Sequence, residues 1–154
     1  MGVNPTIEIR VAVAQDASLI SGLIQKTIRV SNAQDYSSAT IDRVADNLSV
    51  EAVRDLIDDR VVLVAVKADK ILGTAGLDGA VMRTVFVHPE MQGLGLGTLL
   101  VNAIEATAKQ KRLTAVRVPA SLTAEAFYAR LGYTAIRQIV QGDERTIVME
   151  KCLD

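Results

Sequence analysis

The sequence has very few of the residues that build metal clusters, disulfide frameworks and aromatic binding platforms. Among 154 residues there are one cysteine, one histidine and no tryptophan, and aromatic residues make up only 3%. A single thiol excludes a disulfide framework, and one thiol with one imidazole excludes a His/Cys metal cluster. So few rings also exclude a platform that stacks nucleic-acid bases. We expect no metal, since no motif suggests a carboxylate site either.

The chain also lacks an excess of charge of either sign. It has 17 Lys and Arg against 18 Asp and Glu, for a formal net charge of -1. Binding to nucleic acid or to a membrane surface would require clustered positive charge, so we expect neither partner. The longest apolar run, Val61–Val66, has the length of a buried strand rather than a membrane span. The first residues lack the pattern of a secretory signal, so we expect a cytoplasmic protein.

What the chain does have is the composition of one soluble α/β domain over residues 1–154, with 49% hydrophobic residues and no repeat or linker. Changes of hydrophobic period mark its elements. In chain order we predict a strand over 7–11, a helix after the N-cap Asp16, a helical region over 41–57 with a second cap at Ser49, strands over 61–66, 70–77 and 80–87, a helix from Gly97 to Arg112, a strand over 115–118 that Pro119 stops, a helix over 123–131 with Gly132 as its left-handed C-cap, and strands over 133–140 and 146–149.

Three alternating glycines, Gly93, Gly95 and Gly97, lie between a predicted strand and a predicted helix. Glycines let backbone N–H groups approach an anion closely, and the helix adds the positive end of its dipole, so the loop suits a phosphate. Tight packing of a βα turn explains the same pattern. A Rossmann fingerprint fails because its third glycine would be Thr98, and a P-loop fails because no Lys precedes that Thr.

This segment resembles motif A of the GNAT superfamily of N-acetyltransferases. The chain has Val85-Phe86-Val87-His88-Pro89 and then Gln92-Gly93-Leu94-Gly95-Leu96-Gly97, which fill every motif position. The run Ala124 to Tyr133, with Phe127-Tyr128 and Gly132-Tyr133, looks like the family's motif B. The resemblance implies a GNAT-type α/β fold: a twisted, mixed, mostly antiparallel sheet, helices on both faces, and a V-shaped splay between the strands at 81–87 and 115–118.

The resemblance also implies acetyl-CoA as co-substrate. Backbone N–H groups from Gln92 to Thr98 would bind the pyrophosphate, and the free edge of Val85-Phe86-Val87, left open where the strand at 115–118 splays away after a bulge, would bind the pantetheine arm like an added strand. An amide there would also polarise the thioester carbonyl. The implied coenzyme-binding residues are Val85, Phe86, Val87, Gln92, Gly93, Leu94, Gly95, Leu96, Gly97, Thr98 and Ser121, the last where many relatives carry Asn.

Tyr128 is the candidate catalytic residue, as the general acid that gives a proton to the leaving coenzyme A thiolate. The alternative is a helix residue that buries its ring and satisfies its hydroxyl locally. Many relatives carry a basic Glu on the strand before motif A, and Val81 stands there in this chain. Deprotonation would then run through water to Glu90, Asp78 or Asp35, or the amine would arrive neutral.

Two residues are candidates for contact with the acceptor. Tyr36 lies in the segment that closes over the acceptor in the family, and is otherwise a surface-loop aromatic. Arg83, on the same strand as Val81 and Val85 and alternating with them, is predicted to face the acceptor pocket and favour a carboxylate on the substrate, or else to be a solvated rim residue. We expect a structural role for His88 and a packed or frayed thiol at Cys152.

The sequence thus indicates an acyltransferase that moves an acetyl group from acetyl-CoA to a primary amine of a small molecule or peptide, by direct attack in a ternary complex. The first alternative is a non-catalytic acyl-CoA-binding or regulatory module with the same fold, which the missing Glu favours. The second is a partner-binding domain without a nucleotide. The identity of the acceptor, the use of an acyl group other than acetyl, and a homodimer are left open.

Overall fold

A computed structural model describes residues 6–33, 35–142 and 144–153, and these form one mixed seven-stranded sheet in the order β1-β2-β3-β4-β5-β7-β6. All neighbouring strands are antiparallel except β4 and β5, which run parallel. The elements are β1 (Glu8–Val11), η1 (Ala14–Asp16), α1 (Ala17–Thr27), η2 (Ile28–Asn32), α2 (Ser38–Asp46), α3 (Val50–Asp59), β2 (Val61–Lys67), β3 (Lys70–Asp78), β4 (Val81–Val87), η3 (Pro89–Met91), α4 (Leu96–Gln110), β5 (Ala115–Ser121), α5 (Glu125–Arg130), β6 (Thr134–Gln141) and β7 (Glu144–Cys152).

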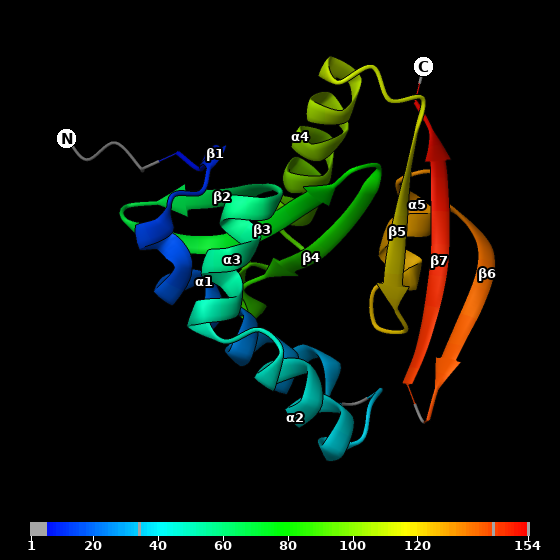
Figure 1. The fold of residues 1–154 in the computed structure, drawn as a ribbon, viewed down its shortest axis with the longest axis horizontal. Helices are drawn as coiled ribbons and strands as arrows, with labels where there is room; N and C mark the ends of the chain where they lie inside the picture. The colour runs from blue at the N-terminus through cyan, green and yellow to red at the C-terminus, as the bar shows by residue number, and fades with distance from the viewer. Residues whose placement is uncertain (1–5, 34, 143, 154) are drawn as a thin grey trace.

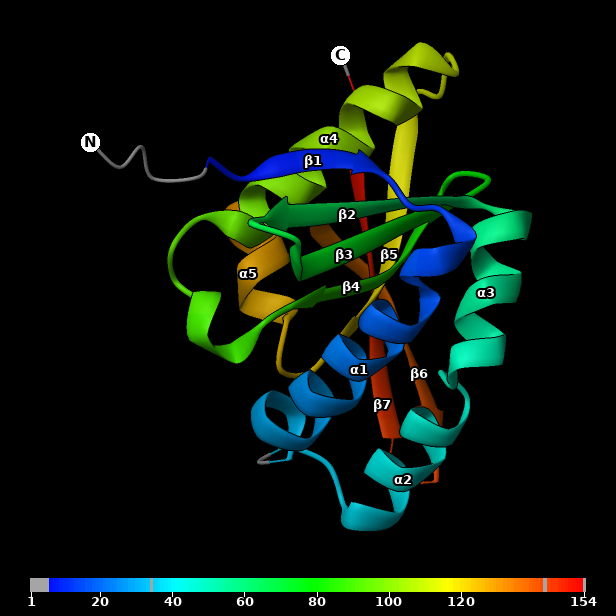
Figure 2. The same ribbon diagram turned by 90° about the vertical axis from the view of Figure 1, so that its left-hand side faces the viewer.

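Helices cover both faces of the sheet, which confirms the predicted fold class (Figures 1 and 2). On one face, α1 and α3 pack on β2 and β3 around a core that includes Ile20, Ile24 and Val64. On the other face, α4 packs on β2, β3 and β4 around Leu100, Ile104 and Met82. Strands β5, β7 and β6 diverge from β1–β4, so that Figure 1 shows the two halves of the sheet as the arms of a V.

The predicted helical region over 41–57 is divided into two helices, α2 and α3, as the cap predicted at Ser49 implies. Each half has its own N-cap, because the side chains of Ser37 and Ser49 accept hydrogen bonds from the backbone N–H groups of Thr40 and Ala52 at 3.2 Å. The cap predicted at Ser49 is therefore confirmed. α2 ends at Asp46, and residues 47–49 separate it from α3. The hydrophobic period alone did not mark this boundary.

The prediction that Pro119 stops its strand is wrong, because β5 continues to Ser121 and Pro119 pairs with Val148 of β7. Arg117 donates its N–H to Ala80 O on the β4 side at 3.0 Å. Backbone groups alternate sides along a strand, so the nitrogen of Pro119 points to that same side. Since β4 has diverged there, the proline removes no ladder hydrogen bond, as on an edge strand.

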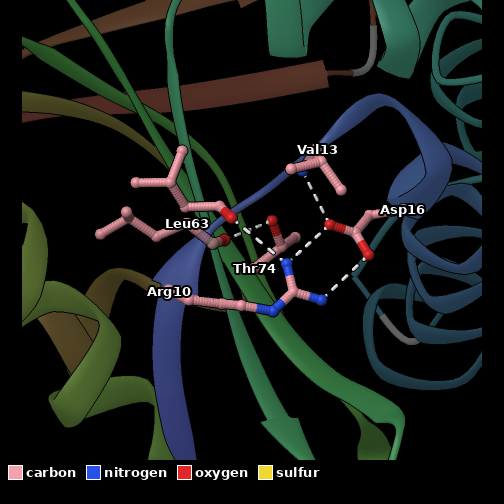
Figure 3. A network of polar contacts seen from close by, with 6 residues as sticks. Arg10, Val13, Asp16, Leu63 and Thr74 are labelled. Carbon is pink, nitrogen blue, oxygen red and sulfur yellow. Dashed lines mark hydrogen bonds and ion pairs between the residues drawn. The ribbon is translucent and has the colours of Figure 1, made fainter.

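A polar network fixes the entry of β1 into α1 (Figure 3). Asp16 occupies the N-cap of α1 as predicted, but its carboxylate makes no capping hydrogen bond. It accepts from both guanidinium nitrogens of Arg10 at 2.8 and 3.1 Å and from the N–H of Val13 at 2.8 Å. In the adjoining sheet, Thr74 Oγ1 donates to Leu63 O at 2.9 Å. The network lets a carboxylate that is only 7% exposed stay charged.

We predict that Asp16→Asn lowers the free energy of unfolding at neutral pH by about 2 kcal/mol, since hydrogen bonds to a charged group are lost. The hydrogen bonds from Arg10 hold the pKa of the Asp16 carboxyl below its usual range, despite burial. A lowered folded-state pKa contributes stability above the unfolded value of about 3.9, and this is lost as pH falls through the folded value.

Urea denaturation of the wild type and the variant at pH 7 and at pH 3 checks this prediction. The gap in free energy of unfolding between the two proteins should narrow at the lower pH. A gap of equal size at both pH values would show that the charge of Asp16 contributes nothing. Asp42→Asn is the matched control, because its ion pair with Arg29 is exposed on both sides and the change should cost less than about 1 kcal/mol.

Candidate functional site

A large cavity lies where β4 and β5 part. The two strands share a single register pair, Val81 and Arg117, and beyond it no ladder joins them in the described chain. The opening is a cavity of about 660 Å³ that reaches from η2 and α2, past β4 and its following loop, to β5, α5 and the start of β7. Among the predicted site residues, the cavity is lined by Tyr36, Arg83, Val85, Phe86, Val87, Gln92, Gly93, Gly95, Gly97, Thr98, Ser121 and Tyr128.

A β-bulge at Thr84 and Val85 bends β4 away from β5. Between the pairs Gly76–Arg83 and Thr74–Phe86, two residues of β4 oppose one residue of β3. Thr84 has a φ of 54°, which is rare for a β-branched residue. The extra residue breaks the pairing with β5. It also shifts the alternation of side chains, so that Arg83 and Val85, two positions apart across the bulge, lie on opposite faces of the sheet. The bulge therefore lies in β4 and not in β5.

The bulge also decides which backbone groups of β4 are free. His88 donates its N–H to Leu72 O on β3 at 2.8 Å. Because backbone groups alternate sides, Val87 and Val85 direct their N–H and C=O groups away from β3, into the cavity. The C=O of Val87 already accepts from Gln92 Nε2 at 3.1 Å. An extended ligand can therefore pair with the backbone of Val85 and the N–H of Val87, as an added strand would.

The loop after β4 presents a row of free backbone donors. The N–H groups of residues 93 to 98 have no acceptor among the described residues, and the last three begin α4. Gly93 and Gly95 have φ values of 79° and 86°, and a Cβ added at either would meet nothing within 4 Å. Left-handed glycines and a helix N-terminus together form a concave surface of donors that favours an anion. This arrangement suits a diphosphate.

The other predicted residues of the loop have different places. Gly97 is required for packing, because a Cβ there would lie 3.0 Å from Phe127 Cζ. The side chain of Leu94 is 69% exposed and that of Leu96 is 1% exposed in the core, so only their backbones can serve the site. Gln92 uses its side chain to tie the loop to η2, since Nε2 donates to Ser31 Oγ at 2.8 Å.

Tyr128 brings a hydroxyl to the cavity wall from α5. Its ring is 3% exposed, and burial raises the pKa of its hydroxyl. This hydroxyl makes no hydrogen bond to any described residue, yet no side-chain polar atom of the described chain is both fully buried and without a partner. The hydroxyl must therefore open into the cavity that the residue lines. The alternative prediction, in which the Tyr128 hydroxyl forms a hydrogen bond to a nearby protein group, is therefore wrong for the described residues.

Tyr36 crosses the far end of the cavity. Its hydroxyl accepts from the N–H of Leu122 at 2.8 Å and donates to Arg145 O at 3.1 Å. Burial raises the pKa of this hydroxyl. The loop before α2 is thus joined to the end of β5 and the start of β7. Only the ring of Tyr36 remains for a substrate, because its hydroxyl is already bonded on both sides.

Simple alternation along the strand predicts that Arg83 and Val85 share a face of the sheet, but they lie on opposite faces. Met82 and Val85 both contact the core under α4, so Arg83 points to the opposite face, and the bulge between them is the reason. Arg83 still lines the cavity, with its Nε 3.6 Å from Asp78 Oδ2 in an exposed pair. It therefore faces the end of the cavity that lies toward α1 and α2.

The remaining candidates are mostly held in local contacts. Ser121 lines the cavity, and its Oγ accepts from the N–H of Ala124 at 3.2 Å. His88 caps η3, since its Nδ1 accepts from the N–H of Glu90 at 3.1 Å. Cys152 is a free, exposed thiol at the end of β7. Nowhere in residues 6–33, 35–142 and 144–153 do three His, Cys, Asp or Glu side chains gather as metal ligands would. Every helix that the structure describes is too short or too polar to span a bilayer.

Sequence reasoning missed several residues that shape the cavity. Thr84 carries the bulge, and a threonine in a strand gives no sign of a positive φ. Phe127 stands against the first turn of α4, and its motif position was the only available signal. Glu144 lines the cavity and pairs with Arg43, more than a hundred positions back along the chain. Contacts between segments so far apart leave no local pattern.

Comparison with known proteins gives one consistent result. The acetyltransferase (GNAT) domain family matches residues 32–152. No curated protein matches the chain. A GCN5-related N-acetyltransferase from Rhodopseudomonas palustris superposes with a TM-score of 0.89 at 24% identity, covering 99% of both chains.

Two other solved structures have the same fold. The PaiA N-acetyltransferase from Thermoplasma acidophilum, solved in complex with coenzyme A, gives a TM-score of 0.84 at 20% identity, covering 96% of this chain and 99% of that one. An aminoglycoside 6'-acetyltransferase type Ii gives 0.73 at 20% identity, covering 94% and 96%. At these identities the likeness is one of fold.

We predict that Tyr36→Phe speeds hydrogen exchange at the Leu122 amide about tenfold and lowers the free energy of unfolding by about 1–2 kcal/mol, because this N–H loses its acceptor. Exchange followed by NMR checks the first effect and urea denaturation the second. Ser37→Ala, which removes the cap of α2 in the same loop, is the control and should leave Leu122 exchange unchanged. Equal exchange in wild type and Tyr36→Phe would contradict the bridge.

Proposed function

The chain belongs to the GNAT acetyltransferases, and from this premise we propose that it transfers an acetyl group from acetyl-CoA to a primary amine of a small molecule or peptide. One observation carries the proposal. A row of free amides, an unpaired strand edge and a buried tyrosine whose hydroxyl has no partner in the described chain all line one cavity. A binding module would need the first two of these features, whereas a group-transfer enzyme also needs the third.

The residues present fit coenzyme A. The amides of residues 93 to 98 would hold the pyrophosphate, with Gly93 and Gly95 leaving the space that its oxygens require. The free backbone of Val85 and the free N–H of Val87 would pair with the amides of the pantetheine arm. When bound, acetyl-CoA supplies an acetyl group activated as a thioester.

Two groups of this chain would then assist the transfer. The N–H of Val85, the first free donor after the bulge, would stabilise negative charge that develops on the carbonyl oxygen. The Tyr128 hydroxyl would donate its proton to the leaving sulfur. Burial raises the pKa of Tyr128, so its hydroxyl stays protonated and can act as a donor. Attack of the amine on the thioester would be direct, so that no covalent intermediate on a residue of this chain is needed.

The general base, which would take a proton from the amine, is the catalytic role with the least support among the residues of the cavity. Val81 stands where many relatives carry Glu, and the carboxylate of Glu144, which lines the cavity, is paired with Arg43. The amine would therefore arrive neutral or lose its proton through water. This gap favours a second candidate function, a non-catalytic acyl-CoA-binding or regulatory module. Release of free thiol from acetyl-CoA in the presence of a mixed panel of amines would exclude that module, and coenzyme binding without release would support it.

A cytoplasmic location is part of the proposal. Cys152 is a free, exposed thiol, and such thiols stay reduced in the cytosol but not in oxidising compartments. Acetyl-CoA would be the co-substrate of the protein in the cytoplasm.

We predict that Gly95→Asp weakens coenzyme A binding by at least about tenfold, through a side chain and a like charge placed among the donors. Isothermal titration calorimetry measures the change in Kd. Gly79→Asp is the matched control, because Gly79 also has a positive φ of 59° with open space around it, yet does not line the cavity. Equal affinity in both variants would rule out the loop as the phosphate site. Gly97→Asp is a poorer test, since it would also collide with Phe127.

We predict that Tyr128→Phe lowers kcat about 100-fold, the usual size of a general-acid contribution, while the Kd for coenzyme A changes less than about twofold. The ring is kept, so packing should survive. Thiol release under saturating acetyl-CoA gives kcat, and calorimetry gives Kd. An unchanged kcat would remove the hydroxyl from the mechanism.

A further inference from the structure

Behind the cavity wall lies a buried carboxylate that the proposed reaction does not use. Glu105, in the middle of α4, is 8% exposed. Its Oε2 accepts from the Tyr133 hydroxyl at 2.8 Å, and Lys151 Nζ on β7 lies 3.0 Å from its Oε1 and 3.3 Å from its Oε2. Both oxygens of the carboxylate are therefore occupied by donors from outside its own helix.

The Tyr133 ring packs directly against the Tyr128 ring. The two ring centroids are 5.7 Å apart, with an angle of 68° between the planes, which is an edge-to-face contact. The N–H of Tyr133 also donates to the C=O of Tyr128 at 3.1 Å. The other ring against Tyr128 is that of its neighbour Phe127, at 5.1 Å. Because the Tyr128 hydroxyl has no hydrogen bond within the described residues, packing alone sets its direction.

Lys151 holds the other side of the Tyr133 ring. Its Nζ lies 5.7 Å from the centroid of this ring, while its chain passes over Gly132. A Cβ at Gly132 would lie 3.5 Å from Lys151 Cε, which is ordinary van der Waals contact, and the positive φ of 97° is what favours glycine there. The glycine, the lysine and the carboxylate thus fit one another around Tyr133.

A network of this kind is not needed for packing. A phenylalanine at position 133 would fill the same space, and burying an ion pair is often no more stabilising than apolar groups of equal volume. What the hydroxyl and the carboxylate add is direction, because a satisfied polar network allows one arrangement of its members. Here that arrangement fixes the ring that adjoins Tyr128. Since Glu105 belongs to α4, it also ties this ring to the helix that begins at the loop of free amides.

We propose that Glu105, Tyr133 and Lys151 form a positioning network that holds the Tyr128 ring with its hydroxyl directed into the cavity. They are positioning residues, since none of them lines the cavity. The inference rests on the proposed function for the role of Tyr128. Its consequence for the reaction is that loss of the network should lower kcat through Tyr128 and leave coenzyme binding intact.

A double-mutant cycle tests this coupling. Tyr133→Phe keeps the ring but removes the hydroxyl, and should lower kcat about tenfold in the wild-type background, as a small displacement of a catalytic group does, with the Kd for coenzyme A unchanged. In the Tyr128→Phe background the same substitution should have no further effect on kcat. An equal fall in both backgrounds, or no fall in either, would overturn the network.

Further variants distinguish loss of the network from a general loss of stability. Glu105→Gln should reproduce the fall in kcat, because the amide loses one of the two acceptor oxygens and the negative charge that faces Lys151. Glu150→Gln is the matched control: it breaks the 2.8 Å ion pair with Arg117 beside Lys151 on β7, but touches neither tyrosine, so kcat should stay unchanged. A fall of kcat in Glu150→Gln equal to that in Glu105→Gln would show a general effect of stability and contradict the proposal.

A readout without activity separates this inference from the proposed function. Ring flipping of Tyr128, followed by NMR with labelled tyrosine, should be at least about tenfold faster in Tyr133→Phe than in the wild type, if the network restrains the ring. Unchanged flipping would refute the network even if Tyr128→Phe has lost activity. Faster flipping together with a Tyr128→Phe variant of full activity would uphold the network and refute the role of Tyr128 as the acid.

Discussion

The bulge in β4 is the constraint on which the rest of the site depends. A regular strand would pair with β5 along its length, and the sheet would close with no cavity. With Thr84 at a φ of 54°, the chain inserts one residue, bends, and leaves only Val81 in register with Arg117. A β-branched residue in this region costs of order 1–3 kcal/mol, and such strain persists only where the surrounding structure enforces it. The three-stranded pairing of β2, β3 and β4 supplies that enforcement, and the opened edge is what a ligand can use.

The two halves of the sheet then need other connections, because their backbones no longer meet beyond the first pair. The loop before α2 and α2 itself provide them. Tyr36 bonds to Leu122 and Arg145, Asp35 accepts from Thr123 Oγ1 at 2.6 Å, and Arg43 pairs with Glu144. At the opposite end, Glu105 on α4 holds Lys151 on β7. Side chains thus connect the two halves of the sheet at the rim of the cavity, through Tyr36, and behind its wall, through Glu105.

The two ends of the cavity present different chemical groups, backbone amides at one end and side chains at the other. The end proposed to bind the coenzyme presents free amides and an unpaired strand edge, so it depends on conformation more than on residue type, and only the glycines at positive φ are required by their chemistry. The end toward α1 and α2 uses side chains, such as Arg83 and the ring of Tyr36. Side chains at this end can change without altering the backbone proposed to bind the coenzyme, so one fold can accommodate different acceptors. Tyr128 lines the same cavity from α5.

By itself, the sequence determined the elements, the family and the loop of donors. Hydrophobic period marks strands and helices locally, and the glycine spacing with Phe127-Tyr128 identified the fold, because these signals lie within a few residues of one another. Only the tertiary structure decided the place of the bulge, the face of Arg83, the continuation of β5 through Pro119, and the partners of Glu105. Each of these depends on a neighbour distant in the chain. A proline is tolerated in a strand only if the next strand has moved away, and a carboxylate is buried only if donors from other elements reach it.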